Sequence, residues 1–280
     1  MKKRLIVISN SKNPYLNHAV EETLFSAYAA YEQILFLWVN TASVVLGRNQ
    51  NPWREVDVRY IDEHDVALIR RLSGGGTVYH DEGNLNYSFI STHGAYDEMV
   101  QFQIIQNALK QFELESVLSK RKDLSIDGFK VSGSAFYMKG MRRIHHGTML
   151  VNADLKRLSE SLKATDETFK KRFLKSKSIA STPSKVVNLK SLRPNITVAD
   201  VTNAIVDAYY KTCEYQVEFM EMDEVIKAHA PIVEQHKMRH ASWQWVFGET
   251  PNFTYQAASG QIYDVSNGKV TPEGDINLII

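Results

Sequence analysis

The strongest chemical signal in the sequence is a run of three glycines, 74–76, between charged side chains. Arg70 and Arg71 precede the glycines, and His80 and Asp81 follow them after a short alternating stretch that is typical of a β-strand. Because glycine has no Cβ, successive backbone N–H groups can point into one concavity and bind an anion, with an arginine as countercharge. We therefore predict a phosphate-binding loop. It matches neither GxxxxGK[ST] nor GxGxxG, so a different mode of nucleotide binding is required.

A second candidate group surrounds Lys130. The small residues Ser132, Gly133 and Ser134 follow this lysine and would allow a ligand to approach the backbone closely. A partly desolvated ammonium at this place would stabilise negative charge that grows on a carboxylate or a phosphate. The residues alone leave a second interpretation open, in which Lys130 extends into solvent from a strand edge.

Other reactive side chains fit catalysis less well. His145 and His146 are neighbours on a predicted strand, so they point to opposite faces and cannot readily bind one metal ion. Each is open to a structural role or to packing against a substrate. The sequence has no GxSxG motif, and Ser73 is better explained as part of the anion loop. Cys213 lies in a predicted helix away from the glycine-rich turns, so we do not expect a catalytic thiol.

The composition describes an ordinary globular protein. The chain has 280 residues, 44% of them hydrophobic and 23% charged, with a formal net charge of +1. That balance gives no reason to expect binding to nucleic acid. The single cysteine excludes an intramolecular disulfide and favours an intracellular, cytoplasmic protein. The apolar start, residues 5–8, is too short for a signal peptide or a membrane span and predicts a buried strand, so we expect no membrane association.

Strands outnumber helices in the pattern, and no regular βαβ alternation is present. This favours an α+β fold with a mixed or antiparallel sheet. We predict a monomer, because no apolar stripe is left unexplained. The predicted helices are 18–32 with Asn17 as N-cap, 56–64, 97–112 and 198–213 starting near Thr197 or Asp200, and 154–175 is amphipathic. The predicted strands are 5–8, 34–39, 41–46, 66–69, 85–91 and 146–152, with hairpins at 124–131 and 262–270.

Taken together and in order, several of these motifs resemble the lipoate–protein ligase family. The resemblance covers about residues 5–250. The segments that carry it are NHAVEE (17–22), FLW (36–38), VLGRNQNPW (45–53), RRLSGGGTVYHDEGNLNYSF (70–89), KVSGSA (130–135) and HHGT (145–148).

The resemblance implies a catalytic domain like that of biotin protein ligases and class II aminoacyl-tRNA synthetases. It implies that ATP, accompanied by Mg²⁺ with few or no protein ligands, activates lipoate or octanoate to an acyl-AMP. A lysine of an acceptor domain then takes the acyl group and AMP leaves. The expected acceptors are the lipoyl domains of 2-oxoacid dehydrogenase E2 subunits and the glycine-cleavage H protein. A eukaryotic member would work in the mitochondrial matrix.

By position, Lys130 resembles the catalytic lysine, which contacts both the lipoyl carbonyl and the α-phosphate. Asp123 is expected to assist through the metal or on the adenine side. The implied nucleotide- and adenylate-binding residues are Arg71, Gly74, Gly75, Gly76, Thr77, Val78, Tyr79, Asp123, Lys130 and Thr148, and the implied lipoate-binding residues are Trp38, Arg70, Ser73, Gly75, His80, Lys130, Ala135, His146 and Gly147.

Two departures from the family pattern, and one segment that resembles another branch of the family, bear on function. Lys122 stands where members commonly have asparagine, which puts a cation beside the nucleotide. We predict a catalytic domain at 1–245 followed by only a short accessory segment, 246–280, whereas bacterial members often carry a larger C-terminal domain. Residues 178–189 resemble the lipoyltransferase branch of the family. This keeps a lipoyltransferase, which uses preformed lipoyl-AMP or a lipoylated donor, as the alternative function. An acyltransferase with a cysteine acyl-enzyme and a carrier without catalysis are both disfavoured.

Overall fold

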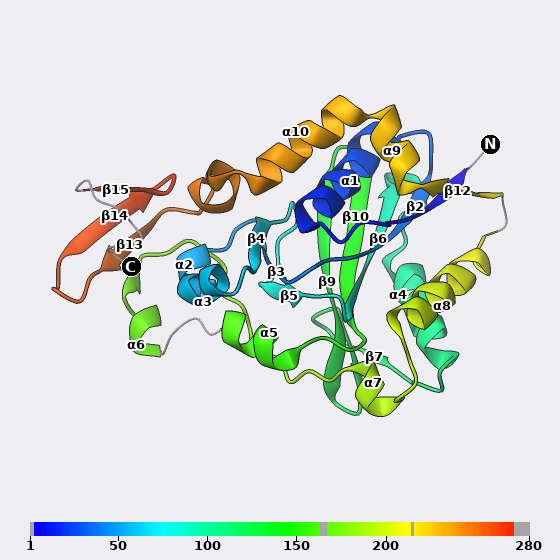
Figure 1. Cartoon of the computed structure of the whole chain (residues 1–280), viewed down its shortest axis with the longest axis horizontal. Helices are drawn as coiled ribbons and strands as arrows, with labels where there is room; N and C mark the ends of the chain where they lie inside the picture. The colour runs from blue at the N-terminus through cyan, green and yellow to red at the C-terminus, as the bar shows by residue number, and fades with distance from the viewer. Residues whose placement is uncertain (1–2, 163–166, 214–215, 272–280) are drawn as a thin grey trace. The chain divides into compact units, whose positions relative to one another are not determined.

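The computed structural model describes residues 3–162, 167–213 and 216–271. They form two compact units, each built from three chain segments. Unit 1 comprises segments within 1–41, 81–153 and 183–236, and unit 2 comprises segments within 42–80, 154–182 and 237–280. The expected domain boundary between residues 245 and 246 falls within unit 2 and stays a prediction. Figure 1 shows the helices and strands of both units.

Unit 1 is built on one eight-stranded mixed sheet with the order β12-β1-β2-β6-β10-β9-β8-β7. β1 runs parallel to both β12 and β2, and the other neighbours are antiparallel. The strands are β1 (Arg4–Ile8), β2 (Gln33–Val39), β6 (Asn84–Thr92), β7 (Val117–Leu118), β8 (Asp123–Ile126), β9 (Phe129–Lys139), β10 (Arg142–Leu150) and β12 (Val217–Glu221).

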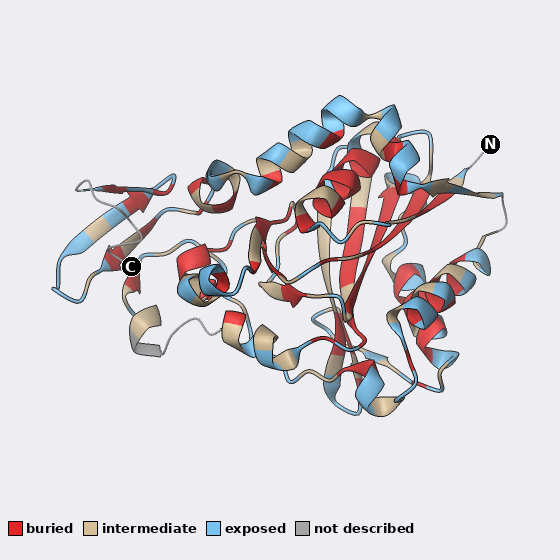
Figure 2. Cartoon of the chain, viewed as in Figure 1, coloured by how far each residue is buried: buried red, intermediate tan, exposed pale blue. Residues whose placement is uncertain are grey.

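Helices cover both faces of this sheet, which explains why residues 34–39 of β2 are an unbroken apolar run. The buried residues of α1 pack on one face with Phe36 and Trp38, whereas those of α4 and α8 pack on the other with Leu35 and Leu37. Figure 2 shows the buried stripe along the strands. The helices of unit 1 are α1 (Pro14–Ala27), the 3₁₀ turn η1 (His93–Ala95), α4 (Glu98–Lys110), α7 (Leu189–Leu192), α8 (Val198–Tyr210), α9 (Met222–Ala228) and α10 (Ala230–Ala241), of which α10 continues into unit 2.

The helix predicted from Asn17 begins earlier, so that N-cap assignment is wrong. Asn13 caps α1 by accepting from the backbone N–H of Leu16. Asn17 lies inside the helix, fully buried, and its amide donates to Val39 O at 2.9 Å and to Asn40 Oδ1 at 3.0 Å. An asparagine that can cap a helix can equally bond a neighbouring loop, and sequence spacing does not separate the two.

Other expectations for unit 1 are confirmed with shifted ends. Thr197 caps α8 through a capping box with Asp200. The hairpin between β8 and β9 turns at Asp127 and Gly128, which both have positive φ as an Asp-Gly turn requires. The strand expected at 146–152 begins at Arg142 instead, and α8 ends at Tyr210, so Cys213 lies beyond the helix.

Unit 2 contains two small sheets. The order β4-β3-β5 makes a three-stranded sheet, and β11-β13-β14-β15 makes an antiparallel four-stranded one. The expected 262–270 hairpin is confirmed, with Asn267 and Gly268 at positive φ. The elements are β3 (Ser43–Leu46), α2 (Pro52–Glu55), α3 (Val58–Glu63), β4 (Ala67–Arg70), β5 (Val78–His80), α5 (Leu155–Ser161), α6 (Glu167–Lys170), β11 (Phe173–Leu174), the π-helical turn η2 (Gln244–Gly248), β13 (Phe253–Gln256), β14 (Ile262–Ser266) and β15 (Lys269–Thr271).

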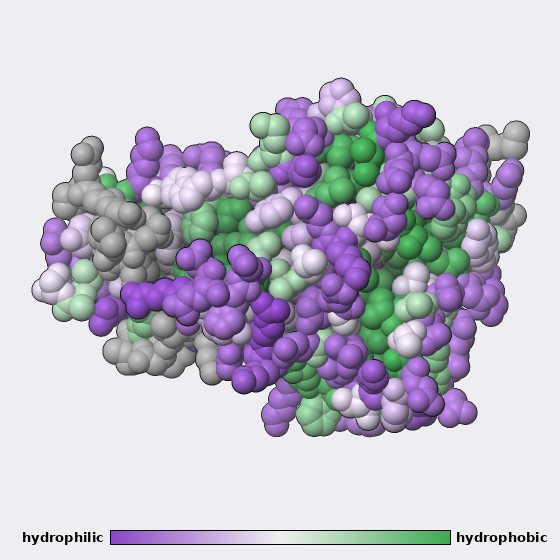
Figure 3. Space-filling view, viewed as in Figure 1, coloured by the Kyte–Doolittle hydropathy of each residue, from purple (hydrophilic) through white to green (hydrophobic). Residues whose placement is uncertain are grey.

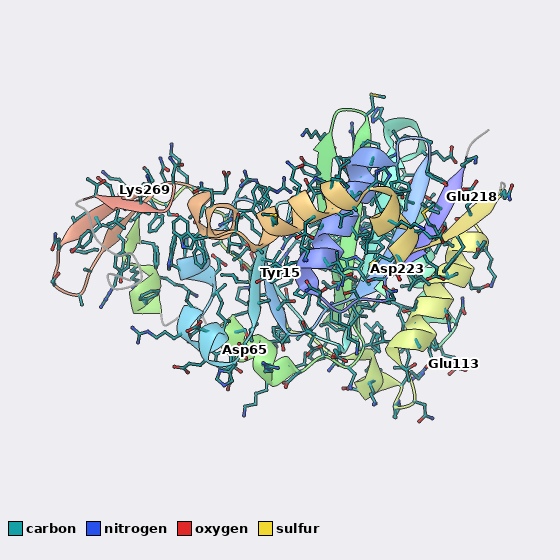
Figure 4. The ribbon with its side chains drawn as sticks, turned by 45° about the horizontal axis from the view of Figure 1, so that its top comes forward. Tyr15, Asp65, Glu113, Glu218, Asp223 and Lys269 are labelled. Carbon is teal, nitrogen blue, oxygen red and sulfur yellow. The ribbon has the colours of Figure 1, made fainter. Side chains whose placement is uncertain are left out.

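The α+β class with a mixed sheet is therefore confirmed. Hydrophilic residues cover much of the face seen in Figure 3, and Figure 4 marks Glu218 on the edge strand β12. Glu218 accepts from the Tyr31 hydroxyl and pairs with Lys3, which ties β12 to the sheet. Among the described residues, no helix is both long and apolar enough to cross a bilayer.

The two faces of α4 give a direct test of this packing. Phe102 is fully buried in the core between α4 and the sheet, whereas Met99 on the same helix is 60% exposed. We expect Phe102→Ala to lower the free energy of unfolding by about 3–5 kcal/mol and Met99→Ala to change it by less than about 0.5 kcal/mol. Urea unfolding followed by circular dichroism measures both. Equal losses would contradict this assignment of the core.

Candidate active site

Four predicted site residues of unit 1 lie on one face of the large sheet, the face that α1 covers. Trp38 on β2 stands opposite Asn86 on β6, and Asn86 stands opposite Thr148 on β10. His146 stands opposite Ala135 on β9. Directly opposed residues share a face, and residues two apart on a strand do too. Trp38, Ala135, His146 and Thr148 therefore line one surface, as a shared binding site requires.

Lys130 reaches this surface through an irregularity in its strand. The β8–β9 register shifts between Leu124 and Ser125, and such a bulge changes the direction of a side chain. The Lys130 ammonium lies 2.8 Å from Asp123 Oδ1, with the lysine side chain 23% exposed. This ion pair and partial burial support the functional interpretation of Lys130 over a lysine that extends into solvent.

Gly133 makes the room for that ammonium. A Cβ added at Gly133 would lie 2.6 Å from Lys130 Nζ, which is closer than any real contact. The backbone of Lys130 is also fixed, because its N–H donates to Lys185 O and its carbonyl accepts from the N–H of Val187. Gly133 and the backbone of Lys185 and Val187 thus position the lysine itself.

Lys122, the residue expected as an extra cation beside the nucleotide, is held by another group. Its φ is +65°, a region that asparagine adopts more readily than lysine. Its ammonium forms an ion pair with the Glu98 carboxylate at the start of α4. The positive charge of Lys122 is thereby partly neutralised by protein.

Glu21 is a site residue that the sequence analysis missed. It lies on α1, is 3% exposed, and its Oε1 accepts from the Ser88 hydroxyl at 2.5 Å and lies 2.7 Å from His146 Nδ1. Burial by itself would raise the pKa of Glu21, but the His146 ring lowers it to about 2, helped by His18 and Ser88. An ionised carboxylate therefore fixes the orientation of His146. The available signal was a glutamate among the apolar residues of a predicted helix.

The neighbours of His146 on β10 face the other way, as strand alternation predicts. His145 lies 3.0 Å from Gln101 Oε1 and 3.1 Å from Ser134 Oγ, and burial lowers its pKa to about 3, so it is a neutral structural histidine. Gly147 also faces that side, where a Cβ would lie 2.3 Å from the Tyr87 hydroxyl oxygen. Gly147 thus makes room for Tyr87, and its side-chain position does not join the surface around His146.

Two asparagines beside Thr148 also escaped the sequence analysis. The Asn84 amide donates to Asn86 Oδ1 at 3.1 Å, and both side chains are buried. Asn84 Oδ1 and Asn86 Nδ2 have no hydrogen-bond partner within the described part of the chain. Buried polar atoms of this kind suit a polar ligand. Two asparagines spaced two apart on a predicted strand were the signal.

In unit 2, Arg71 shapes the glycine loop. Its guanidinium donates to Gly74 O at 2.6 Å, to Gly76 O at 2.8 Å and to Ser73 Oγ at 2.9 Å. Gly75 has a φ of +87°, and a Cβ at Gly47 would lie 2.1 Å from its carbonyl oxygen. The predicted loop is therefore a curved segment with a fixed positive charge bonded to its carbonyls, which favours an anion near its N–H groups.

Arg70 has a different environment from that of Arg71. It is fully buried, and its N–H groups donate to neutral oxygens in two segments; burial lowers its pKa to about 10. In unit 2 it joins residues 47–50 to the turn η2, and its predicted role in lipoate binding stays a prediction. The acceptors are the carbonyls of Gly47, Arg48, Gln50, Trp245 and Val246 and the hydroxyl of Thr250.

The residues after the glycines continue into the core of unit 2. Thr77 donates its hydroxyl to Gln50 Oε1 at 2.8 Å and its N–H to Ser181 Oγ at 3.0 Å. Val78 begins β5, Tyr79 packs into the core cluster, and His80 ends the strand, buried. Gln50 and Ser181 were not predicted as site residues. Within the described residues, no group of three or more His, Cys, Asp or Glu could hold a metal ion.

Comparison with known proteins gives one family. Residues 13–210 match the sequence model of the lipoyl protein ligase A/B catalytic domain. Lipoate-protein ligase A of Psychrobacter cryohalolentis is 39% identical over 258 residues, which is 90% of this chain and 75% of that protein.

Two solved structures share the fold. P. falciparum LipL1, crystallised in complex with lipoate, has a TM-score of 0.75 at 27% identity and covers 95% of this chain and 82% of its own. A bipartite lipoate protein ligase from Thermoplasma acidophilum, studied with its E2 lipoyl domain, has a TM-score of 0.73 at 25% identity and covers 89% of this chain and 97% of its own.

The buried Glu21 carboxylate predicts a pH dependence of stability. Because its pKa falls from 4.5 to about 2 on folding, ionised Glu21 stabilises the fold above pH 4.5, and this stabilisation is lost as the pH falls toward 2. Glu21→Gln should lower the free energy of unfolding by roughly 2–3 kcal/mol at pH 7 and by much less near pH 2.5. Urea unfolding at both pH values measures the difference.

The matched control for Glu21 is Glu82→Gln. Glu82 pairs with Lys12 at 2.6 Å, but both side chains are more than half exposed. Such a pair contributes about 0–1 kcal/mol, so its loss should leave stability nearly unchanged at either pH. A Glu21→Gln effect that did not depend on pH would contradict the assignment of an ionised Glu21.

Proposed function

We propose, since this chain belongs to the lipoyl protein ligase A/B family, that it is a lipoate–protein ligase that uses ATP to activate lipoate or octanoate. In the first step a carboxylate oxygen of the acid attacks the α-phosphorus of ATP, and pyrophosphate leaves. In the second step the ε-amine of an acceptor lysine attacks the acyl carbonyl of the adenylate, AMP leaves, and the amine loses a proton. No enzyme nucleophile is needed, because the adenylate already carries a good leaving group.

The observation that carries this proposal is the position of Lys130. Its ammonium is held by Asp123 at 2.8 Å on the sheet face that also bears His146 and Trp38. A fixed positive charge at that place would stabilise the charge that grows on the carboxylate and the α-phosphate. We assign Lys130 as the catalytic residue. The Asn84 and Asn86 amides near Thr148 offer an acceptor and a donor to the nucleotide.

The remaining assignments follow the same proposal. The glycine loop 74–76 would bind phosphate through its N–H groups, with the charge of Arg71 beside them. Trp38, Ala135 and His146 would line the acyl pocket. An apolar pocket discriminates weakly between acyl chains of similar length, so octanoate is a second substrate. Mg²⁺ would come with ATP and would neutralise phosphate charge. It prefers oxygen ligands, which the Asp123 carboxylate and the phosphate oxygens would supply.

We propose lipoyl domains of 2-oxoacid dehydrogenase E2 subunits and the glycine-cleavage H protein as acceptors. The T. acidophilum relative was studied with an E2 lipoyl domain. Mixing each purified apo-acceptor with the enzyme, ATP and lipoate tests them one at a time. We further propose a monomer, a catalytic domain at 1–245, and a short accessory segment at 246–280.

A lipoyltransferase is the second candidate. The resemblance of residues 178–189 to that branch favours it, and Ser181 in this segment contacts both Thr77 and Gln50. A transferase would pass lipoate from supplied lipoyl-AMP to an acceptor and release no pyrophosphate from ATP. A ligase would release pyrophosphate without any acceptor present.

The first test of the ligase is pyrophosphate release from ATP, Mg²⁺ and lipoate. We expect Lys130→Ala to lower the rate by about 100-fold or more, because it removes the charge at the reacting centre. Lys139→Ala, an exposed lysine on the same strand, should keep the rate of the parent protein. Absence of pyrophosphate release by the parent protein would rule out the ligase, and an active Lys130→Ala would remove Lys130 from catalysis.

Gly133→Ala tests the position of the Lys130 ammonium without removing it. The new methyl group would collide with Lys130 Nζ, the end of a flexible side chain, so the fold should persist while the ammonium moves. We expect pyrophosphate release to fall by about 10-fold or more and the melting temperature to change little. Gly128→Ala in the hairpin turn is the control. Gly128 has a positive φ and a Cβ added there would meet open space, so the substitution should lower stability and leave the rate of pyrophosphate release intact.

A further inference from the structure

The Gln50 side chain joins three separate segments of unit 2. It is fully buried, and its Oε1 accepts from the Gly47 N–H at 2.9 Å and from the Thr77 hydroxyl at 2.8 Å. Its Nε2 donates to Ser181 Oγ at 2.9 Å. One carboxamide therefore fixes the turn before α2, the end of the glycine loop and the 179–181 segment.

Other contacts transmit this position to the glycines. The Arg48 N–H donates to Ser73 O at 2.8 Å, at the residue before the glycines. The Gly75 carbonyl lies so close to Gly47 that no Cβ fits there. On the far side of the loop, Ser181 Oγ accepts from the Thr77 N–H at 3.0 Å. The turn that Gln50 holds thus contacts the glycine loop at both of its ends.

We infer that Gln50 is a positioning residue for the nucleotide-binding loop. It contacts no substrate in this assignment and acts through Gly47, Thr77 and Ser181; the inference rests on the proposed function of the loop in binding ATP. A buried amide that satisfies three partners holds them in one geometry, and its loss leaves the Gly47 N–H and the Thr77 hydroxyl without their acceptor and releases Ser181 from Gln50. The loop N–H groups would then lose their common direction toward phosphate.

This inference predicts a selective effect on ATP. Gln50→Leu keeps the size of the side chain and removes its hydrogen bonds, so we expect the KM for ATP to rise about 10-fold. The KM for lipoate should stay within twofold, because the proposed acyl pocket is built by unit 1. Steady-state pyrophosphate release with each substrate varied in turn measures both constants. Gln33→Leu is the matched control, since Gln33 is a buried glutamine that donates to Ser91 in unit 1.

Two further measurements separate positioning from plain loss of stability. Amide hydrogen exchange without substrate should become faster at Gly47 and Thr77 in Gln50→Leu and not in Gln33→Leu. In a double-mutant cycle, Gln50→Leu should raise the KM for ATP less in a Ser181→Ala background, because the two residues act together. If Gln50→Leu does not fold, Gln50→Glu keeps the Oε1 acceptor, loses the donor to Ser181, and serves in its place.

The outcomes are distinct. If Gln50→Leu has the same KM for ATP and the same exchange rates as the parent protein, the inference is overturned. Equal rises in the KM for ATP and the KM for lipoate would also overturn it. If the parent protein releases no pyrophosphate, the proposed function fails and the exchange data alone decide whether Gln50 holds the loop.

Discussion

The alternation of side chains across the eight-stranded sheet is the constraint on which the site in unit 1 depends. It puts Trp38, Ala135, His146 and Thr148 on one face and sends His145 and Gly147 to the other. The bulge between β8 and β9 changes that alternation beside Lys130. The site thus combines a regular sheet surface with one β-bulge. Gly133 makes the space for the Lys130 ammonium. A regular hairpin would keep the same residues without giving this position.

Buried charges are compensated in three different ways. Glu21 is paired with the His146 ring and a serine hydroxyl, so it stays ionised. Arg71 bonds the carbonyls of its own loop, and its charge becomes part of the shape of that loop. Arg70 has only neutral acceptors, which are backbone carbonyls and the Thr250 hydroxyl. A buried charge without its partners costs several kcal/mol. Each of these networks therefore favours the one local backbone conformation in which the charge keeps its partners.

The sequence predicted features that depend on local chemistry. These are local patterns: the run of three glycines, the turn at Asp127 and Gly128, the cap of α8 at Thr197, and the opposed directions of His145 and His146. It failed for features that depend on tertiary contacts. Asn17 bonds a loop instead of capping a helix, and Glu21 meets His146 only after β10 and α1 pack together. Gln50 was one residue in a motif, and nothing in its neighbours shows that it reaches Ser181, 131 positions away.

Arg70 connects the C-terminal part of the chain to the segment that carries the glycine loop. The sequence predicts an accessory segment after Trp245 and lipoate binding by Arg70, and it does not predict a contact between the two. In unit 2 the Arg70 guanidinium holds the carbonyls of Trp245 and Val246, and the Trp245 indole donates back to the Arg70 carbonyl at 2.7 Å. The Trp245 ring also lies against the guanidinium of Arg48, which pairs with Glu249. Residues 245–250 therefore lie beside the glycine loop, because the same turn, 47–50, contacts both, and Arg70 joins the start of the proposed accessory segment to the rest of unit 2.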